Sequence, residues 1–421
     1  MPERWFYEDG GQRQGPIERE ALEKLVGSGV VGQATLVWRE GMAGWTPAAA
    51  VAGLIAVAPP PARKVRHTVP PLPMPEPEPR PSILVLIARR LSALADVPVP
   101  ARIPVRDILV GGLARRTPTE DIERTFDIGT LDTTPALADI ESGWPVPRVF
   151  WRILGLSLAT YLVMRFILSE FRYINDLPVT IFVGAVAEPL AIVVLFYEMN
   201  TPRNVSVYQV ARMLLLGGAL SLFTTSIFER LFPGAGAGRV LSALGTGAIE
   251  ETGKMCALIL LVFNRRYRWQ LNGLLFGVAV GAGFAGFETA GYALNHSLNK
   301  ALVRSADDGI FLLDRLFEVI SLRGFLSPGG HVIWTGLLGA AIWKVKGDRP
   351  FAPAMLFSPV VLRRWLIVVL LHGLWDTSTP WESVRLGLLT LLGWYLVFAV
   401  MTEGLDEIET VKKAAAVTAT G

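Results

Sequence analysis

Four polar clusters interrupt the long apolar stretches in the second half of this 421-residue chain. They are Glu250-Glu251-Thr-Gly-Lys254, Phe287-Glu288, His331 and His372-Gly-Leu-Trp-Asp376. A charged side chain at the centre of a bilayer costs roughly 2.5–3.5 kcal/mol on insertion scales, so such residues indicate a functional site. General acid–base hydrolysis requires groups that exchange protons and groups that donate hydrogen bonds. The carboxylates of these clusters can exchange protons, and the imidazoles can donate hydrogen bonds.

The spacing within two of the clusters is helical. Glu250 and Lys254 are four residues apart and share one helix face, while Glu251 lies about 100° further round. A lysine beside two carboxylates keeps one ionised, and repulsion between the carboxylates pushes the other toward protonation. The alternative interpretation is a structural ion pair between helices. His372 and Asp376 have the same four-residue spacing, so Asp376 can fix the tautomer of that imidazole.

Two kinds of catalytic site are compatible with these residues. In one, Glu250 or Glu251 activates a water molecule. In the other, a zinc ion does so, held by ligands drawn from Glu250, Glu288, His331 and His372. The sequence contains no His-Glu-x-x-His motif, and no helix carries two strong ligands at metal-binding spacing. We therefore expect glutamate chemistry without a cofactor, with zinc as the alternative.

The composition predicts a membrane protein. Half of the residues (51%) are apolar, and the net charge of +3 is too small to indicate nucleic-acid binding. Residues 149–402 are a succession of long apolar runs, typical of an all-α polytopic membrane protein. About eight transmembrane helices are predicted, at 149–168, 178–198, 208–230, 239–263, 271–293, 330–343, 365–379 and 383–402.

Basic loops predict the orientation. The loops Arg265–Arg268 and Lys344–Arg349 should both be cytoplasmic, which requires an even number of spans between them. Residues 309–325 are apolar but carry a polar face, so we expect an interfacial helix on the outer face. The protein would then be a multi-pass protein of the cell (inner) membrane with both termini on the cytoplasmic side. The site would open toward the outer face.

The first 148 residues are soluble in character and show no signal-peptide pattern, so we expect them in the cytoplasm. Residues 1–57 are predicted to form a small α+β module, with a strand at Trp5–Tyr7 and a helix that opens at Gly15-Pro16. Three further segments complete the domain prediction: a proline-rich linker at 58–81, a juxtamembrane region at 82–148 that begins with an amphipathic helix, and a tail at 403–421.

The N-terminal module resembles the GYF-like domains of bacterial membrane proteins. Its aromatic first strand is followed by Val37-Trp38-x-x-Gly41-Met42-x-x-Trp45-x-Pro47. The Gly-Tyr-Phe tripeptide of the parent family is missing. The resemblance implies a proline-rich or other cytoplasmic partner for residues 1–57.

The four polar clusters, in their order along the chain, resemble the PrsW family of intramembrane proteases over roughly residues 205–402. The resemblance implies a hydrolytic site in which a glutamate activates water and His331 and His372 stabilise the oxyanion. It implies a substrate anchored in the bilayer, such as an anti-sigma factor. Lys254 would tune the base, and Glu288 and Asp376 would orient the other groups. The alternative from another class is a non-catalytic membrane scaffold or sensor that retains the fold.

Overall fold

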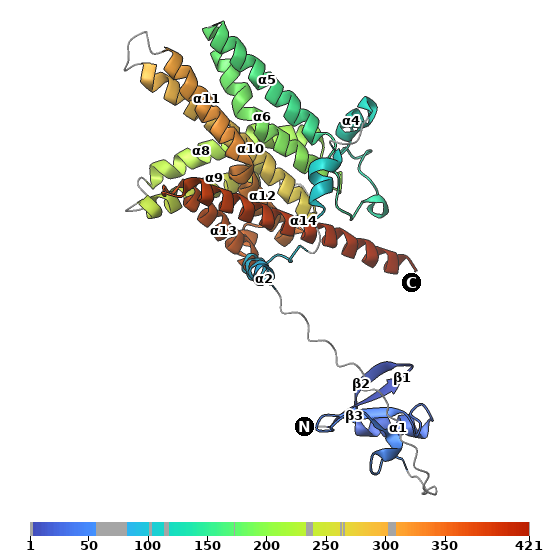
Figure 1. Ribbon diagram of the computed structural model, residues 1–421. Helices are drawn as coiled ribbons and strands as arrows, with labels where there is room; N and C mark the ends of the chain where they lie inside the picture. The colour runs from blue at the N-terminus through green and yellow to red at the C-terminus, as the bar shows by residue number, and fades with distance from the viewer. Residues whose placement is uncertain are drawn as a thin grey trace. The chain divides into compact units, whose positions relative to one another are not determined.

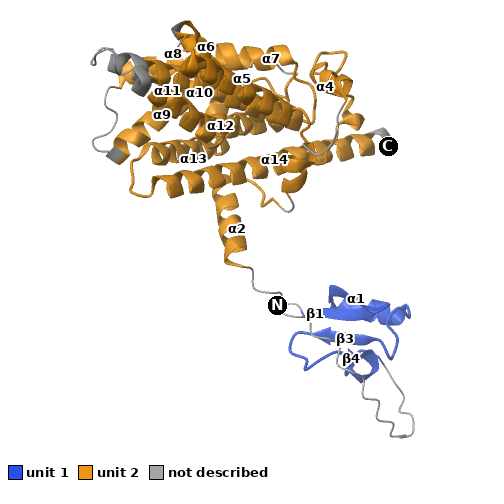
Figure 2. Cartoon of the chain, turned by 45° about the horizontal axis from the view of Figure 1, so that its top comes forward, with its two compact units in different colours: residues 1–79 blue, residues 80–421 orange. Residues whose placement is uncertain are grey.

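The computed structural model describes residues 3–55, 82–100, 103–112, 118–171, 173–232, 239–261, 263, 266–301 and 309–420. The chain divides into two compact units, residues 1–79 and residues 80–421 (Figure 2). The expected proline-rich linker at 58–81 lies outside the described residues. Each unit is described by itself below.

The first unit is a small antiparallel sheet with one helix. Its four strands are ordered β2-β1-β3-β4, and Trp5 and Leu22 are among the buried residues of its core. Its elements are β1 (Arg4–Asp9), β2 (Gln12–Glu18), α1 (Arg19–Gly27), β3 (Leu36–Arg39), β4 (Thr46–Pro47) and the short helix η1 (Ala48–Ala50).

The predicted helix start at Gly15-Pro16 is wrong. Both residues lie within strand β2, and helix α1 begins only at Arg19. Strand β2 is at the edge of the sheet. A proline is tolerated in an edge strand because its missing N–H need not pair with a neighbouring strand.

The second unit is a bundle of long helices (Figure 1). The hairpins α5–α6 and α10–α11 lie side by side in it, and α12, α13 and α14 pack together beside α10. The helices of this bundle are α5 (Phe150–Glu170), α6 (Leu177–Met199), α7 (Val207–Arg212), α8 (Gly218–Leu231), α9 (Arg239–Leu261), α10 (Gln270–Ala301), α11 (Gly309–Leu326), α12 (His331–Lys346), α13 (Pro359–Asp376) and α14 (Glu382–Thr420). Helix α7 continues into α8 through the wider turn η5 (Met213–Gly217).

Six helical stretches in the described part of the chain are long and apolar enough to cross a membrane. They are Phe150–Glu170, Leu177–Met199, Val207–Leu231, Gln270–Asn295, Leu313–Lys346 and Glu382–Thr418. The other two expected spans also form helices, α9 and α13. Every 18-residue stretch of either helix contains at least three charged residues, whereas each of the six contains an apolar 18-residue stretch with at most two. Some of these charged residues belong to the polar clusters.

Helix α11 is the segment that we expect to form an interfacial helix on the outer face. It packs against α6 and α10, with Leu316, Phe317 and Ile320 buried among Tyr161 and Ala293. Its buried apolar face explains why this segment looked like a span. Its polar residues Asp314, Arg315 and Glu318 form the opposite face.

The juxtamembrane region 82–148 belongs to the second unit, and it contacts helices far along the sequence. It contains α2 (Ile83–Ala95), η2 (Asp107–Gly111), α4 (Thr119–Phe126) and η3 (Leu137–Asp139). Arg364 of α13 donates to the Ala95 carbonyl (2.8 Å), and Lys412 of α14 donates to the Ile140 carbonyl (2.7 Å). This region therefore covers the ends of the membrane helices.

Glycines allow α10 and α12 to approach each other closely. A side chain at Gly277 would collide with the Thr335 carbonyl, and one at Gly281 would collide with the His331 carbonyl. Gly339 of α12 faces Gly273 of α10 in the same way. Stripes of small residues permit this kind of backbone contact in membranes. The contact holds His331 beside the middle of α10.

We predict that Gly281→Val destabilises the protein and Gly291→Val does not. Both glycines lie on α10, but nothing lies within 4 Å of an added Cβ at Gly291. Overpacking costs roughly 1–3 kcal/mol, so thermal unfolding of purified protein in detergent should show a lower midpoint for Gly281→Val alone. Equal midpoints for the two variants would contradict the close approach of α10 and α12.

Candidate active site

Lys254 lies at the centre of the polar cluster. Its ammonium nitrogen is 2.7 Å from Glu251 Oε1, 3.1 Å from Glu250 Oε2 and 2.9 Å from His331 Nδ1. The side chain is fully buried, and the ammonium also lies over the Phe284 ring, 3.9 Å from its centroid. One cation therefore joins two carboxylates of α9 to an imidazole of α12.

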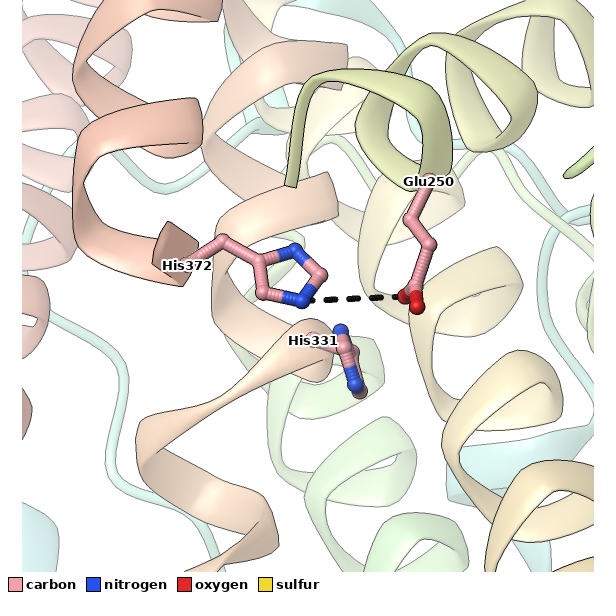
Figure 3. A group of neighbouring side chains, drawn as sticks. All are labelled: Glu250, His331 and His372. Carbon is pink, nitrogen blue, oxygen red and sulfur yellow. Dashed lines mark ion pairs between the residues drawn. The ribbon is translucent and has the colours of Figure 1, made fainter. Parts of the chain in front are cut away.

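His372 of α13 is held from both sides. Its Nδ1 is 2.9 Å from Glu251 Oε1, and its Nε2 is 3.3 Å from Asp376 Oδ2 and 3.7 Å from Glu250 Oε2 (Figure 3). Because Glu251 Oε1 accepts from the ring, Nδ1 carries a proton. In the neutral imidazole, Nε2 then presents its lone pair toward Glu250 and Asp376.

His331 of α12 is held by charged groups as well. Since the Lys254 ammonium can only donate, Nδ1 of His331 accepts and its Nε2 carries the proton. That Nε2 is 3.2 Å from Glu288 Oε2 on α10. The two imidazoles lie 4.8 Å apart, centroid to centroid, and their planes are steeply inclined to each other.

Arg323 is a site residue that the sequence interpretation missed. It comes from α11, and its guanidinium is 2.5 Å from Glu288 Oε2 and 3.0 Å from Thr289 Oγ1. It therefore contacts the same carboxylate oxygen of Glu288 as His331 does. The sequence signal for Arg323 is the polar face of residues 309–325, which we assign to an interfacial helix from the sequence.

A pocket of about 410 Å³ lies beside this cluster. Five of the seven expected site residues line it, and they are Glu250, Glu288, His331, His372 and Asp376. Glu251 and Lys254 are fully buried behind that wall. The rest of the lining includes Tyr292, Trp334 and Trp375, the α11 residues Leu322 and Arg323, and Arg385 of α14. The structure thus brings all seven residues together but gives them unequal access to the pocket.

Close packing of α9 against α13 explains how His372 reaches Glu251. A Cβ on Gly247 would meet the His372 side chain and the Val369 carbonyl, and one on Gly373 would meet Leu244. Gly247 of α9 faces α13, and Gly373 of α13 faces α9, so the two backbones can approach closely. The histidine side chain is then long enough to reach from α13 to Glu251.

Glu250, His331 and His372 could also hold a metal ion. Their ligand atoms all lie within 4.8 Å of one another, and two histidines with one glutamate are a ligand set of catalytic zinc. The contact of Glu251 with His372 Nδ1 matches the carboxylate that commonly orients a metal-binding imidazole. His331 fits less directly, because Lys254 and Glu288 occupy both of its nitrogens.

Two regions of the chain are similar to known proteins. Residues 206–402 match the family model described as PrsW family intramembrane metalloprotease, and residues 5–54 match GYF domain 2. Protease PrsW of Halalkalibacterium halodurans is 26% identical over 206 residues, covering 46% of this chain and 80% of that protein. Protease PrsW of Bacillus subtilis is 29% identical over 126 residues, covering 29% and 57% respectively. No solved structure matches significantly.

Proposed function

Because residues 206–402 form a domain of the PrsW family, we propose that this protein is an intramembrane endopeptidase that cleaves a membrane-anchored protein. The relatives support a protease function. The observation that carries the proposal is the pocket itself. It exposes the carboxylates of Glu250, Glu288 and Asp376 and two imidazoles, carried by four different helices, and a buried lysine neutralises part of their charge.

We assign the role of base to Glu250. It lines the pocket, whereas its neighbour Glu251 is fully buried and accepts from both Lys254 and His372. Glu250 can therefore take a proton from a water molecule in the pocket and pass it to the leaving amine. Glu251 fixes the orientation of His372, which is a positioning role.

The imidazoles supply the donors for the negative charge that develops on the scissile carbonyl oxygen. His331 carries its Nε2 proton at the pocket wall, and Glu288 and Arg323 hold that ring in place. His372 can donate from Nε2 once it is protonated, and Asp376 stabilises that form. Such preorganised donors contribute the largest part of many rate enhancements.

The family description favours a second version of the same function, with zinc held by Glu250, His331 and His372. The ion would lower the pKa of a bound water and polarise the carbonyl. Glu251 would orient His372 in this version too. His331 would have to release either Lys254 or Glu288 to become a ligand. In the glutamate version His331 must likewise release Glu288 before its Nε2 proton can reach the oxyanion, so this requirement is common to both versions.

The substrate and the cellular setting are part of the proposal. A pocket among membrane helices suits a substrate that is itself anchored in the bilayer, as an anti-sigma factor is. We place the enzyme in the inner membrane with its N-terminal unit in the cytoplasm. The GYF-like unit, whose aromatic residues include Phe6 and Trp38 at 5.8 Å, would bind a cytoplasmic or proline-rich partner.

Glu250→Gln should abolish cleavage of a co-expressed single-span substrate without loss of protein from the membrane. General-base help is worth roughly 10²–10⁴ in rate, and glutamine keeps the size of the side chain but cannot take the proton. His372→Ala should lose about 10²–10³ through the missing donor. Cleavage is measured as the appearance of the shortened substrate on a gel.

The matched control is Glu318→Gln, an exposed carboxylate of α11 that should leave cleavage unchanged. Treatment of the purified enzyme with a chelator separates the two chemistries: persistent activity supports glutamate, and a loss that zinc restores supports the metal version. If Glu250→Gln and His372→Ala both cleave at the wild-type rate, the scaffold alternative replaces the protease.

Cysteine labelling tests the orientation. In a Cys256→Ser background, Pro380→Cys between α13 and α14 should react with a membrane-impermeant maleimide in intact cells. Asp348→Cys between α12 and α13 should react only after permeabilisation, because the basic loop that contains it should face the cytoplasm. The reverse pattern would refute the outward-opening site.

A further inference from the structure

A second polar pocket lies at the start of α5 and the end of α6. Its volume is about 460 Å³, within the range typical of ligand sites. Three arginines line it: Arg124 of α4, Arg148 just before α5, and Arg203 just after α6. Trp144 and Tyr197 also line it, and both residue types are common where membrane helices meet the aqueous phase.

The described carboxylates that line this pocket form no ion pair with Arg148 or Arg203, so these two guanidinium groups are available to bind an anion. Glu198 is occupied by the backbone N–H groups of residues 148–150, at 2.6–3.0 Å. Asp121 lies 3.8 Å from Arg124, and Glu141 is exposed at the rim. In the described part of the chain, no ion pair is formed by the guanidinium of Arg148 or Arg203.

Tyr197 indicates that a partner is missing. The residue is 4% exposed, and its hydroxyl is buried without a hydrogen-bond partner among the described residues. A buried hydroxyl left in this way costs free energy unless something binds it. Arg203 also has a positive φ of 45°, a conformation that is uncommon for a side chain of this size and that clusters at ligand-binding and active sites.

The same tyrosine also lines an apolar cavity of about 250 Å³. It is lined by Tyr197 together with residues of α5, α6, α7 and η5, among them Ile153, Leu190, Val194 and Leu214. Every residue of its lining is apolar or aromatic. A polar pocket and an apolar cavity that share one wall match the two parts of an amphiphile.

We propose that these two cavities together bind one glycerophospholipid with a zwitterionic headgroup. Its phosphate lies between Arg148 and Arg203 and accepts the hydrogen bond of the Tyr197 hydroxyl. Its ammonium meets Asp121 and Glu141, and one acyl chain fills the apolar cavity. Basic pockets between membrane helices recognise lipid phosphates in this way. The site lies outside the protease pocket and does not depend on the proposed catalytic function.

Native mass spectrometry of delipidated protein in detergent tests this proposal, with phosphatidylethanolamine added back as the probe. The Arg148→Gln/Arg203→Gln variant should bind the lipid at least about tenfold more weakly than wild type, since each lost charge-assisted contact is worth roughly that factor. Ala211→Trp, an exposed position on the wall of the apolar cavity, should also lose binding by filling the space for the acyl chain.

The matched control is Arg89→Gln/Arg90→Gln on the exposed face of α2, which removes the same charge at another exposed site and should leave binding unchanged. Equal binding by wild type and the Arg148/Arg203 variant would overturn the site. Tighter binding of phosphatidylglycerol than of phosphatidylethanolamine would overturn the zwitterionic assignment. Binding of soluble glycerophosphoethanolamine as tight as that of the lipid would overturn the role of the apolar cavity.

Discussion

The architecture of the site depends on one buried ion pair, between Lys254 and Glu251. Both side chains are fully buried, and their charged atoms are 2.7 Å apart. Removing two charges from water costs several kcal/mol each, and their attraction repays this only with good geometry and further hydrogen bonds. Here those hydrogen bonds come from His331 and His372, so the ion pair and the imidazoles require one another. Such a pair contributes little net stability, which makes a functional reason for it more convincing.

The surrounding helices are arranged to make this pair possible. Glycines let α12 approach α10 and let α13 approach α9, and each close contact brings one histidine to the carboxylates of α9. Helix α11 closes the remaining side through Arg323 and Glu288. The polar network is thereby enclosed by these five helices, and the pocket is its opening.

The sequence predicted the long apolar helices and the residues that lie together around the pocket, because apolar runs and four-residue spacing are local properties. The unequal access of Glu250 and Glu251 could not be predicted, since the packing of α12 and α13 against α9 determines which carboxylate is covered. Arg323 was missed for a similar reason: its partner Glu288 lies 35 residues away on another helix. Gly15-Pro16 was misread because a glycine–proline step is compatible with both a helix start and an edge strand.

A double-mutant cycle on Lys254 and Glu251 tests the central claim most directly. Lys254→Met leaves a buried carboxylate without its cation and should lower the free energy of unfolding in detergent by about 3–5 kcal/mol. Lys254→Met/Glu251→Gln removes both charges and should regain most of that stability while proteolysis stays lost. Effects of the two single changes that add within about 0.5 kcal/mol would show that the groups do not interact, and would contradict the account.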